Sequence, residues 1–141
     1  MSWLLDTNVI CEPTRRAPAA RVVEWLQSVP TSDCYTSVIT MGEIRRGILR
    51  LPAGARRRKL EKWMREEFRP AFEGRIIFLG EEEISAWAEL LAGLEKRGRS
   101  MPAIDSLIAA TALAHDLTIA TRNTADFAQS GVQVFDPWRQ E

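Results

Sequence analysis

The chain has 141 residues, a formal net charge of zero and 45% apolar residues, which is typical of one folded domain and argues against disorder. No apolar run approaches the roughly 20 residues that cross a bilayer, and the carboxylate of Asp6 argues against a secretory leader. We therefore expect a cytoplasmic protein in which Cys11 and Cys34 stay reduced.

Apolar and β-branched runs alternate with stretches of helical periodicity along the chain. The predicted strands are residues 3–5, 34–39, 75–79, 117–121 and 132–135. The first two predicted helices are residues 19–29 and a helix from residue 40 through Leu51. A basic helix follows, with Leu60, Trp63, Met64 and Phe68 facing inward. The remaining helices are one marked by Ile84 to Leu94, one from Pro102 to about His115, and a short one at residues 124–129. This alternation predicts a single α/β domain over residues 1–141, with a parallel sheet between layers of helices.

The charges are unevenly distributed. Between Arg45 and Arg75 there are eleven Lys or Arg residues against four Asp or Glu, a local excess of seven positive charges. Such a segment could meet a polyanion, or it could be the solvated face of a surface helix. Spacing alone leaves both interpretations open.

Four acidic residues are placed near the ends of predicted strands or the starts of helices. Asp6 ends the first strand, Glu43 follows the second, and Asp126 follows the strand that ends at residue 121. Asp105 falls in the first turn of the helix after Pro102. Because ligands in parallel sheets bind beyond the carboxyl ends of the strands, we expect these four acids to converge at that edge.

Crowded carboxylates oppose folding unless a cation compensates them. Their oxygens suit Mg²⁺ or Mn²⁺, and the sequence has no His/Cys cluster that would suit zinc. A divalent ion held in this way can activate a water and stabilise charge on a phosphodiester. The pattern therefore indicates phosphodiester hydrolysis.

Each acid also has a purely structural interpretation. Asp6 could be the N-cap of the turn that follows it, and the spacing from Thr40 to Glu43 is that of a capping box. Asp105 and Asp126 could simply stabilise helix N-termini. The spacing does not decide between these roles.

Four segments resemble the motifs of PIN domains, in the family's order. They are LLDTNVI at 4–10, SVITMGEIRRG at 37–47, DSLIAATA at 105–112 and TRNTADF at 121–127. The segment VFDPW at 134–138 is similar to the usual closing strand, and the short single-domain form, with Cys11-Glu12-Pro13 after the first motif, looks like VapC and FitB toxins.

The resemblance implies a three-layer sandwich with a five-stranded parallel sheet flanked by helices. It also implies a toxin of a type II toxin–antitoxin system, an endoribonuclease that uses Mg²⁺ or Mn²⁺ to cleave RNA. A cognate DNA-binding antitoxin would inhibit it, and the toxin would form a homodimer within a larger complex.

Carried over by motif, the core acids are Asp6, Glu43 and Asp105, which would hold the metal. The fourth position falls on Asn123 or on Asp126, and the resemblance leaves this open. Thr7 and Thr121 are secondary candidates that could bind a water or phosphate, or could equally cap and pack. Arg46 and Arg122 are candidate substrate contacts, although exposed arginines are usually only solvated.

Other residues and functions carry less weight. Trp25, Trp63 and Trp87 fall on apolar faces, which favours core or dimer contacts over base stacking. A second hypothesis is a catalytically weak PIN-fold partner that binds an antitoxin and helps regulate operator DNA. A third is a phosphatase with Asp6 as nucleophile, which would need an aspartate where this chain has Asn8.

Overall fold

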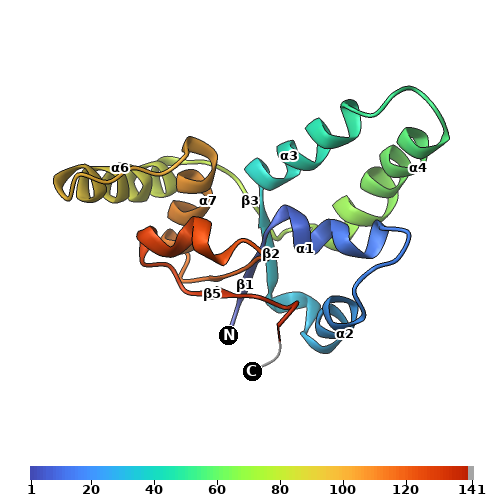
Figure 1. Cartoon of the computed structure of the whole chain (residues 1–141), viewed down its shortest axis with the longest axis horizontal. Coiled ribbons are helices and arrows are strands. Elements are labelled where there is room, and N and C mark those ends of the chain that lie inside the picture. The colour runs from blue at the N-terminus through green and yellow to red at the C-terminus, as the bar shows by residue number, and fades with distance from the viewer. Residues whose placement is uncertain (140–141) are drawn as a thin grey trace.

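The computed structural model describes residues 1–139 and contains a five-stranded, all-parallel sheet in the order β3-β2-β1-β4-β5 (Figure 1). The strands are β1 Trp3–Leu5, β2 Cys34–Ser37, β3 Ile76–Ile77, β4 Thr118–Ala120 and β5 Val134–Phe135. Leu4 on the central strand is paired with Tyr35 on one side and Ile119 on the other. The carboxyl ends of β2, β1 and β4 therefore lie side by side.

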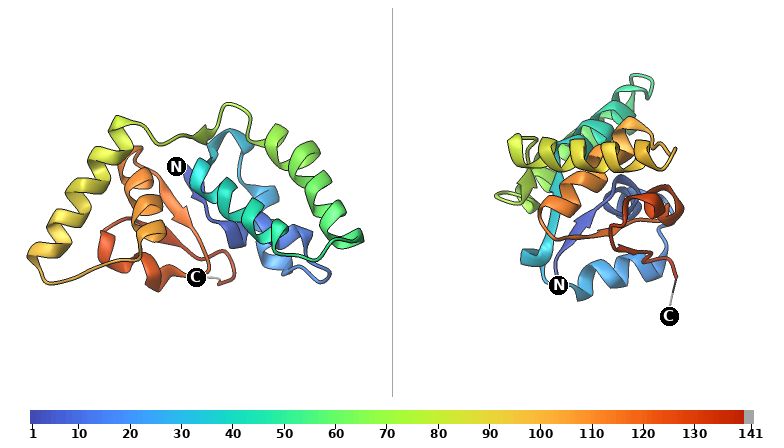
Figure 2. Two further views of the ribbon diagram at one scale, coloured as in Figure 1. Left: turned by 90° about the horizontal axis from the view of Figure 1, so that it is seen from above. Right: turned by 90° about the vertical axis from the view of Figure 1, so that its left-hand side faces the viewer.

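Helices precede, connect and cover these strands. They are α1 Thr7–Cys11, α2 Ala20–Ser28, α3 Val38–Leu49, α4 Ala55–Trp63, α5 Arg69–Ala71, α6 Glu81–Lys96 and α7 Ala103–Ala114, with the shorter turns η1 Glu12–Thr14, η2 Thr31–Asp33, η3 Met64–Phe68 and η4 Thr124–Ser130. Figures 1 and 2 show α6 and α7 at one end of the molecule and α3 and α4 at the other, with the strands between them.

The sheet separates two hydrophobic clusters. Leu5 and Ala120 belong to a cluster with Ile44, Ile48 and Phe68. The preceding residues, Leu4 and Ile119, belong to another cluster, formed with Ile108, Ala112 and Phe127. Because successive residues of a strand point to opposite faces, this division confirms the predicted three-layer sandwich.

The observed elements differ from the predicted ones mainly at their ends. The strand predicted over residues 34–39 ends at Ser37, because the Ser37 hydroxyl accepts a 3.1 Å hydrogen bond from the Thr40 N–H and starts α3 at Val38. Pro102 is the N-cap of α7 and not a residue of its first turn. The strands predicted at 75–79 and 132–135 shrink to two residues each on the sheet edges.

The predicted basic helix is present, and its course is interrupted. It runs as α4, continues through a π-helical turn in η3 and ends in α5 after Pro70. Within residues 1–139 no helix combines the length and the apolar composition needed to span a bilayer. Cys11 and Cys34 are both free thiols, and burial raises the pKa of Cys11 to about 11, so this thiol is unreactive at neutral pH.

Candidate active site

Asp6 lies at the carboxyl end of β1 and is only 8% exposed. Its Oδ1 accepts a 2.9 Å hydrogen bond from the Thr7 N–H, so it does act as the N-cap of α1. Its Oδ2 accepts a second hydrogen bond, of 2.8 Å, from the hydroxyl of Thr121 beyond β4. Capping therefore accounts for only one of the two carboxylate oxygens.

The Thr121 hydroxyl is the centre of a small buried network. It accepts hydrogen bonds from the Asn123 N–H at 3.0 Å and from the Asn8 amide at 3.4 Å. Because both of these partners are donors, the single hydroxyl proton is directed to Asp6. Asn8 also accepts a 3.2 Å hydrogen bond from the Arg122 N–H through Oδ1, which ties the start of α1 to the turn after β4.

Glu43 reaches the same region from α3. It is the sixth residue of a helix whose N-cap is Ser37, so the capping box predicted from Thr40 and Glu43 is wrong. Its Oε1 instead accepts a 3.2 Å hydrogen bond from the Thr7 hydroxyl. Thr7 and Thr121 therefore both donate to carboxylates of the site, which the sequence did not indicate.

The pKa values of Asp6, Glu43 and Asp105 are all raised, and burial is the largest cause in each case. Burial raises the pKa of Asp6, and the charge of Asp126 adds to this, while the hydrogen bonds from Thr121 and Thr7 act in the opposite direction. Burial also raises the pKa of Glu43, with further contributions from Asp6 and Asp105. The pKa of Asp105 is raised by burial and then by Asp126 and Asp6. Asp6, Glu43, Asp105 and Asp126, together called the acidic pocket, are therefore linked to one another by charge interactions, and their joint role in holding a metal stays a prediction.

This set of donors fits a divalent cation. All of its charged groups are carboxylates with oxygen donors, and a cation would compensate the burial and mutual repulsion that raise the pKa values of Asp6, Glu43 and Asp105. The hydrogen bonds of Asp6 occupy one side of each oxygen, which fixes the direction of the remaining lone pairs. Mg²⁺ keeps several of its waters, so it needs only one or two of these carboxylates as direct ligands.

A tighter group of acidic side chains lies elsewhere. Among residues 1–139 the one set of three possible metal ligands whose donor atoms all lie within 4.8 Å of one another is Glu82, Glu83 and His115. Glu83 already accepts a 2.7 Å hydrogen bond from the Gly80 N–H and contacts His115 at 2.7 Å. We therefore interpret this group as a structural link between α6 and the end of α7.

The two candidate substrate arginines are both exposed. Burial raises the pKa of Glu43, and the charge of Arg46 opposes this rise, so Arg46 is near enough to Glu43 to act on it. The guanidinium of Arg122 lies over the ring of Trp138, 5.2 Å from its centroid.

The three tryptophans assigned to apolar faces make internal contacts: Trp25 with Trp3 and Phe135, Trp63 with Phe68, and Trp87 with the Ser106 hydroxyl.

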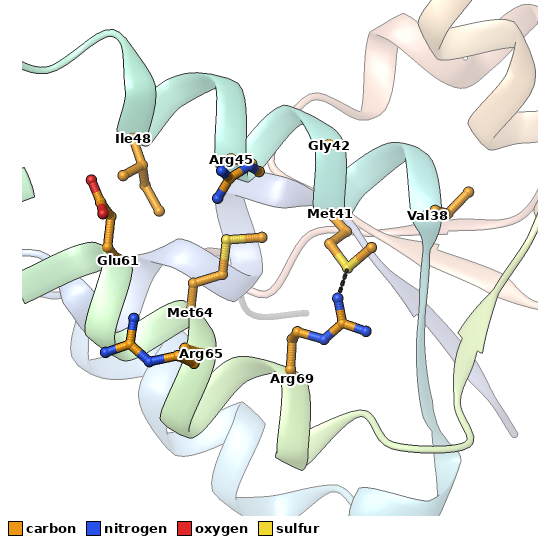
Figure 3. Close-up of a pocket in the computed structure, with 9 residues that line it drawn as sticks. All are labelled: Val38, Met41, Gly42, Arg45, Ile48, Glu61, Met64, Arg65 and Arg69. Atoms are coloured by element: carbon orange, nitrogen blue, oxygen red, sulfur yellow. Dashed lines mark hydrogen bonds between the residues drawn. The ribbon is translucent and has the colours of Figure 1, made fainter.

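A separate groove runs between α3 and the α4–η3 segment (Figure 3). It has a volume of about 500 Å³, and its lining combines Met41, Ile48 and Met64 with Arg45, Arg65 and Arg69. The Arg69 guanidinium donates to the Met41 sulfur at 3.7 Å. None of the four acids lines this groove, so it is a surface distinct from the acidic pocket.

The PIN-domain family model matches residues 3–131. The chain belongs to the PIN-domain family. It is similar to Toxin FitB of Neisseria gonorrhoeae, with 42% identity over 135 residues covering 96% of this chain and 97% of that protein. It is also similar to VapC ribonuclease Y4jK of Sinorhizobium fredii, with 35% identity over 96% of each chain. A solved structure of FitAB bound to an IR36 DNA fragment superposes with a TM-score of 0.92 at 41% identity, covering 99% of this PIN chain and 97% of that one.

Proposed function

We propose that this PIN domain is the toxin of a type II toxin–antitoxin system and acts as a divalent-metal-dependent endoribonuclease. The observation that carries the proposal is that Asp6 and Glu43 both accept hydrogen bonds from Thr7 beyond the end of β1. The charge of Asp126 acts on the pKa of Asp6, and the charge of Asp105 acts on the pKa of Glu43, which supports a shared acidic site. The similarity to a FitB toxin and to a VapC ribonuclease supports RNA as the substrate.

Asp6, Glu43 and Asp105 would hold Mg²⁺ or Mn²⁺. When bound, the ion supplies a water of lowered pKa and stabilises charge on the scissile phosphate. Thr121 and Thr7 orient the carboxylates of Asp6 and Glu43 through their hydroxyl groups.

We assign the fourth acidic position to Asp126 rather than to Asn123. The charge of Asp126 acts on both Asp6 and Asp105. The N–H of Asn123, in contrast, donates to Thr121, and its carbonyl accepts from the Asp126 N–H at 3.1 Å. In this assignment Asp126 supplies charge, and Asn123 shapes the turn that presents it.

Arg46 is the proposed contact for substrate phosphate on the α3 side of the pocket. It is exposed, and its charge opposes the rise that burial causes in the pKa of Glu43. The lysines and arginines of residues 45–75 extend the positive charge away from the pocket, which would favour association with the RNA backbone.

The partner in this proposal is a cognate DNA-binding antitoxin, by analogy with the FitAB complex. The groove of Figure 3 suits an amphipathic segment with acidic side chains, because its lining combines apolar side chains with three arginines and only one acid, Glu61. We also expect a homodimer. Phe78 and Leu79, adjacent between β3 and α6, are 65% and 38% exposed and are candidates for that contact.

The alternative functions make different predictions. A catalytically weak partner would bind its antitoxin and operator DNA and would not cut RNA. A phosphatase would need a second acid at the position of Asn8, whose side chain is instead engaged with Thr121 and Arg122.

The test is cleavage of labelled single-stranded RNA by the purified chain in Mg²⁺, compared with EDTA and with Asp6→Asn. We expect internal cleavage by the parent only in the presence of metal, and none by Asp6→Asn. A parent protein that binds an antitoxin and leaves every RNA intact would support the weak-partner hypothesis instead.

A further inference from the structure

Arg122 makes one backbone and one side-chain contact although it is exposed. Its backbone N–H donates to Asn8, and its guanidinium lies over the Trp138 ring. Both neighbours in sequence belong to the network of the pocket, because Thr121 donates to Asp6 and the Asn123 N–H donates to Thr121. An arginine side chain carries about 2 kcal/mol of rotamer entropy, so holding it over the ring costs free energy that the contact must offset.

The Trp138 ring under Arg122 is held in place by its own contacts. The Trp138 N–H donates to Asp136 Oδ1 at 2.9 Å, and the Trp138 carbonyl accepts a 3.4 Å hydrogen bond from Arg21 on α2. The indole packs against the hydrophobic cluster that contains Leu5. The ring therefore has a defined position before any ligand binds.

The stacked guanidinium is held off the acidic pocket. Within residues 1–139 Arg122 forms no ion pair with a carboxylate, although it follows Thr121 directly. The arginine whose charge acts on Glu43, against the rise in pKa caused by burial, is Arg46. A guanidinium lying on these carboxylates would compete with a metal ion, whereas one stacked by its face keeps its N–H edge available for an anion.

We propose that Trp138 is a positioning residue that holds Arg122 at the rim of the acidic pocket, where the guanidinium binds a phosphate of the RNA substrate. The indole ring lies under the guanidinium carbon, 5.2 Å away, and the N–H groups of the guanidinium bind phosphate oxygens in the bidentate manner typical of arginine. This inference rests on the proposed ribonuclease function and adds to it a residue from the last turn of the described chain. The competing explanation is that the contact between Arg122 and Trp138 only stabilises the turn that contains Trp138.

The test is RNA affinity measured in the Asp105→Asn background, in which we expect cleavage to be blocked. The probe is a short fluorescein-labelled single-stranded RNA of mixed sequence, followed by fluorescence anisotropy. Arg122→Ala should raise the Kd about tenfold, as expected for loss of a charged hydrogen bond. Arg122→Lys, which keeps the charge without the planar fork, should recover only part of this loss.

Trp138→Leu should raise the Kd about threefold through loss of the stacking interaction, and Trp138→Phe should raise it less. In the Arg122→Ala background neither change should have a further effect, because the ring acts through the arginine. Arg97→Ala is the matched control. It removes the same charge from an exposed residue at the far end of α6 and should leave the Kd nearly unchanged.

Two results would overturn the inference. In the first, Arg122→Ala and Trp138→Leu lower the melting temperature but leave the Kd for RNA equal to that of the background protein. The contact between Arg122 and Trp138 then only stabilises the fold. If Trp138→Leu weakens binding equally with and without Arg122, the ring contacts RNA itself and does not act through the arginine. A parent chain that neither binds nor cleaves RNA would instead refute the proposed function, and that failure appears before any variant is compared.

Discussion

The Thr121 hydroxyl, just beyond β4, donates a 2.8 Å hydrogen bond to Oδ2 of Asp6, just beyond β1. This contact joins the ends of two adjacent strands across 115 positions of sequence. Together with the Thr7 N–H on Oδ1, it fixes the Asp6 carboxylate in one orientation. The acidic pocket therefore depends on hydroxyl groups as well as on carboxylates.

Thr121→Val tests this contact. The substitution keeps the volume, removes the donor to Asp6 and leaves the Asn8 amide and the Asn123 N–H without their acceptor. We expect a loss of about 1–3 kcal/mol in the free energy of unfolding and a higher Mg²⁺ concentration for half-maximal cleavage. Thermal unfolding and a Mg²⁺ titration of activity measure the two effects. Thr121→Ser keeps the hydroxyl, so its stability and its Mg²⁺ dependence should be close to those of the parent. If Thr121→Val and Thr121→Ser give the same stability and the same Mg²⁺ dependence, the Thr121 hydroxyl does not orient Asp6.

Asp105→Asn should abolish metal-dependent cleavage while leaving the fold intact. Loss of one charged group at a reaction centre commonly lowers the rate by about a hundredfold or more. Without metal, the variant should melt at the same temperature as the parent or higher, because Asp105 is repelled by Asp126 and Asp6. Asp116→Asn, at an exposed residue after α7, is the control that should retain activity. Full activity in Asp105→Asn would remove this residue from the mechanism.

The stability of the metal-free protein should depend on pH in a direction set by the raised pKa values. A carboxyl whose pKa is higher in the folded state binds more protons there, so its contribution to stability falls as the pH rises. For Asp6 and Glu43 this loss begins near the ordinary values of 3.8 and 4.5 and continues upward to the raised ones. In EDTA, the melting temperature of the parent relative to Asp6→Asn should therefore decline from mildly acidic toward neutral pH.

Saturating Mg²⁺ should remove most of that decline, because the cation compensates the charges. The difference in melting temperature between the parent and Asp6→Asn is the useful quantity. It cancels the pH dependence that both proteins share, including the contribution of carboxyls whose pKa is lowered, such as Glu83. If the melting temperatures of the two proteins in EDTA depend on pH in the same way, the pKa of Asp6 is not raised in the folded protein.

Glu83 should matter for stability and not for cleavage. Hydrogen bonds from the Gly80 N–H and from His115 lower the pKa of its carboxyl. Its stabilising contribution is therefore present at neutral pH and is lost as the pH falls. Glu83→Ala should lower the free energy of unfolding by about 1 kcal/mol through loss of the helix cap and leave the metal dependence of cleavage unchanged. A changed metal dependence would point to the group formed by Glu82, Glu83 and His115 as a second metal site.

The sheet was predicted correctly from the sequence, and the meeting of the acids stays a prediction that follows from the same strand order. Asp6, Glu43 and Asp126 each follow a buried strand, and the ends of adjacent parallel strands necessarily meet. The helix boundary at Ser37 was missed because Val38 and Ile39 are β-branched and suggest a strand, while the hydrogen bond that starts the helix is visible only in three dimensions. Thr40 and Glu43 have the spacing of a capping box, and only the true cap at Ser37 excludes it.

Residues that act through tertiary contacts left no signal in the sequence. Asn8 belongs to the first motif, but its link to Thr121 and Arg122 spans more than a hundred positions. Trp138 lies after the last strand, and nothing in its neighbourhood indicates that its ring meets Arg122. The helix α1 has five residues, too few for a periodic pattern to emerge.

The central claim is that acids far apart in the sequence share one divalent ion at the end of the sheet. Titration of the purified chain with Mn²⁺ by calorimetry tests it most directly, with Asp6→Asn, Asp105→Asn and Glu83→Gln as comparisons. We predict saturable binding by the parent and by Glu83→Gln, and weak or no binding by the two pocket variants. Equal binding by the parent and Asp6→Asn, or loss of binding only in Glu83→Gln, would contradict the account.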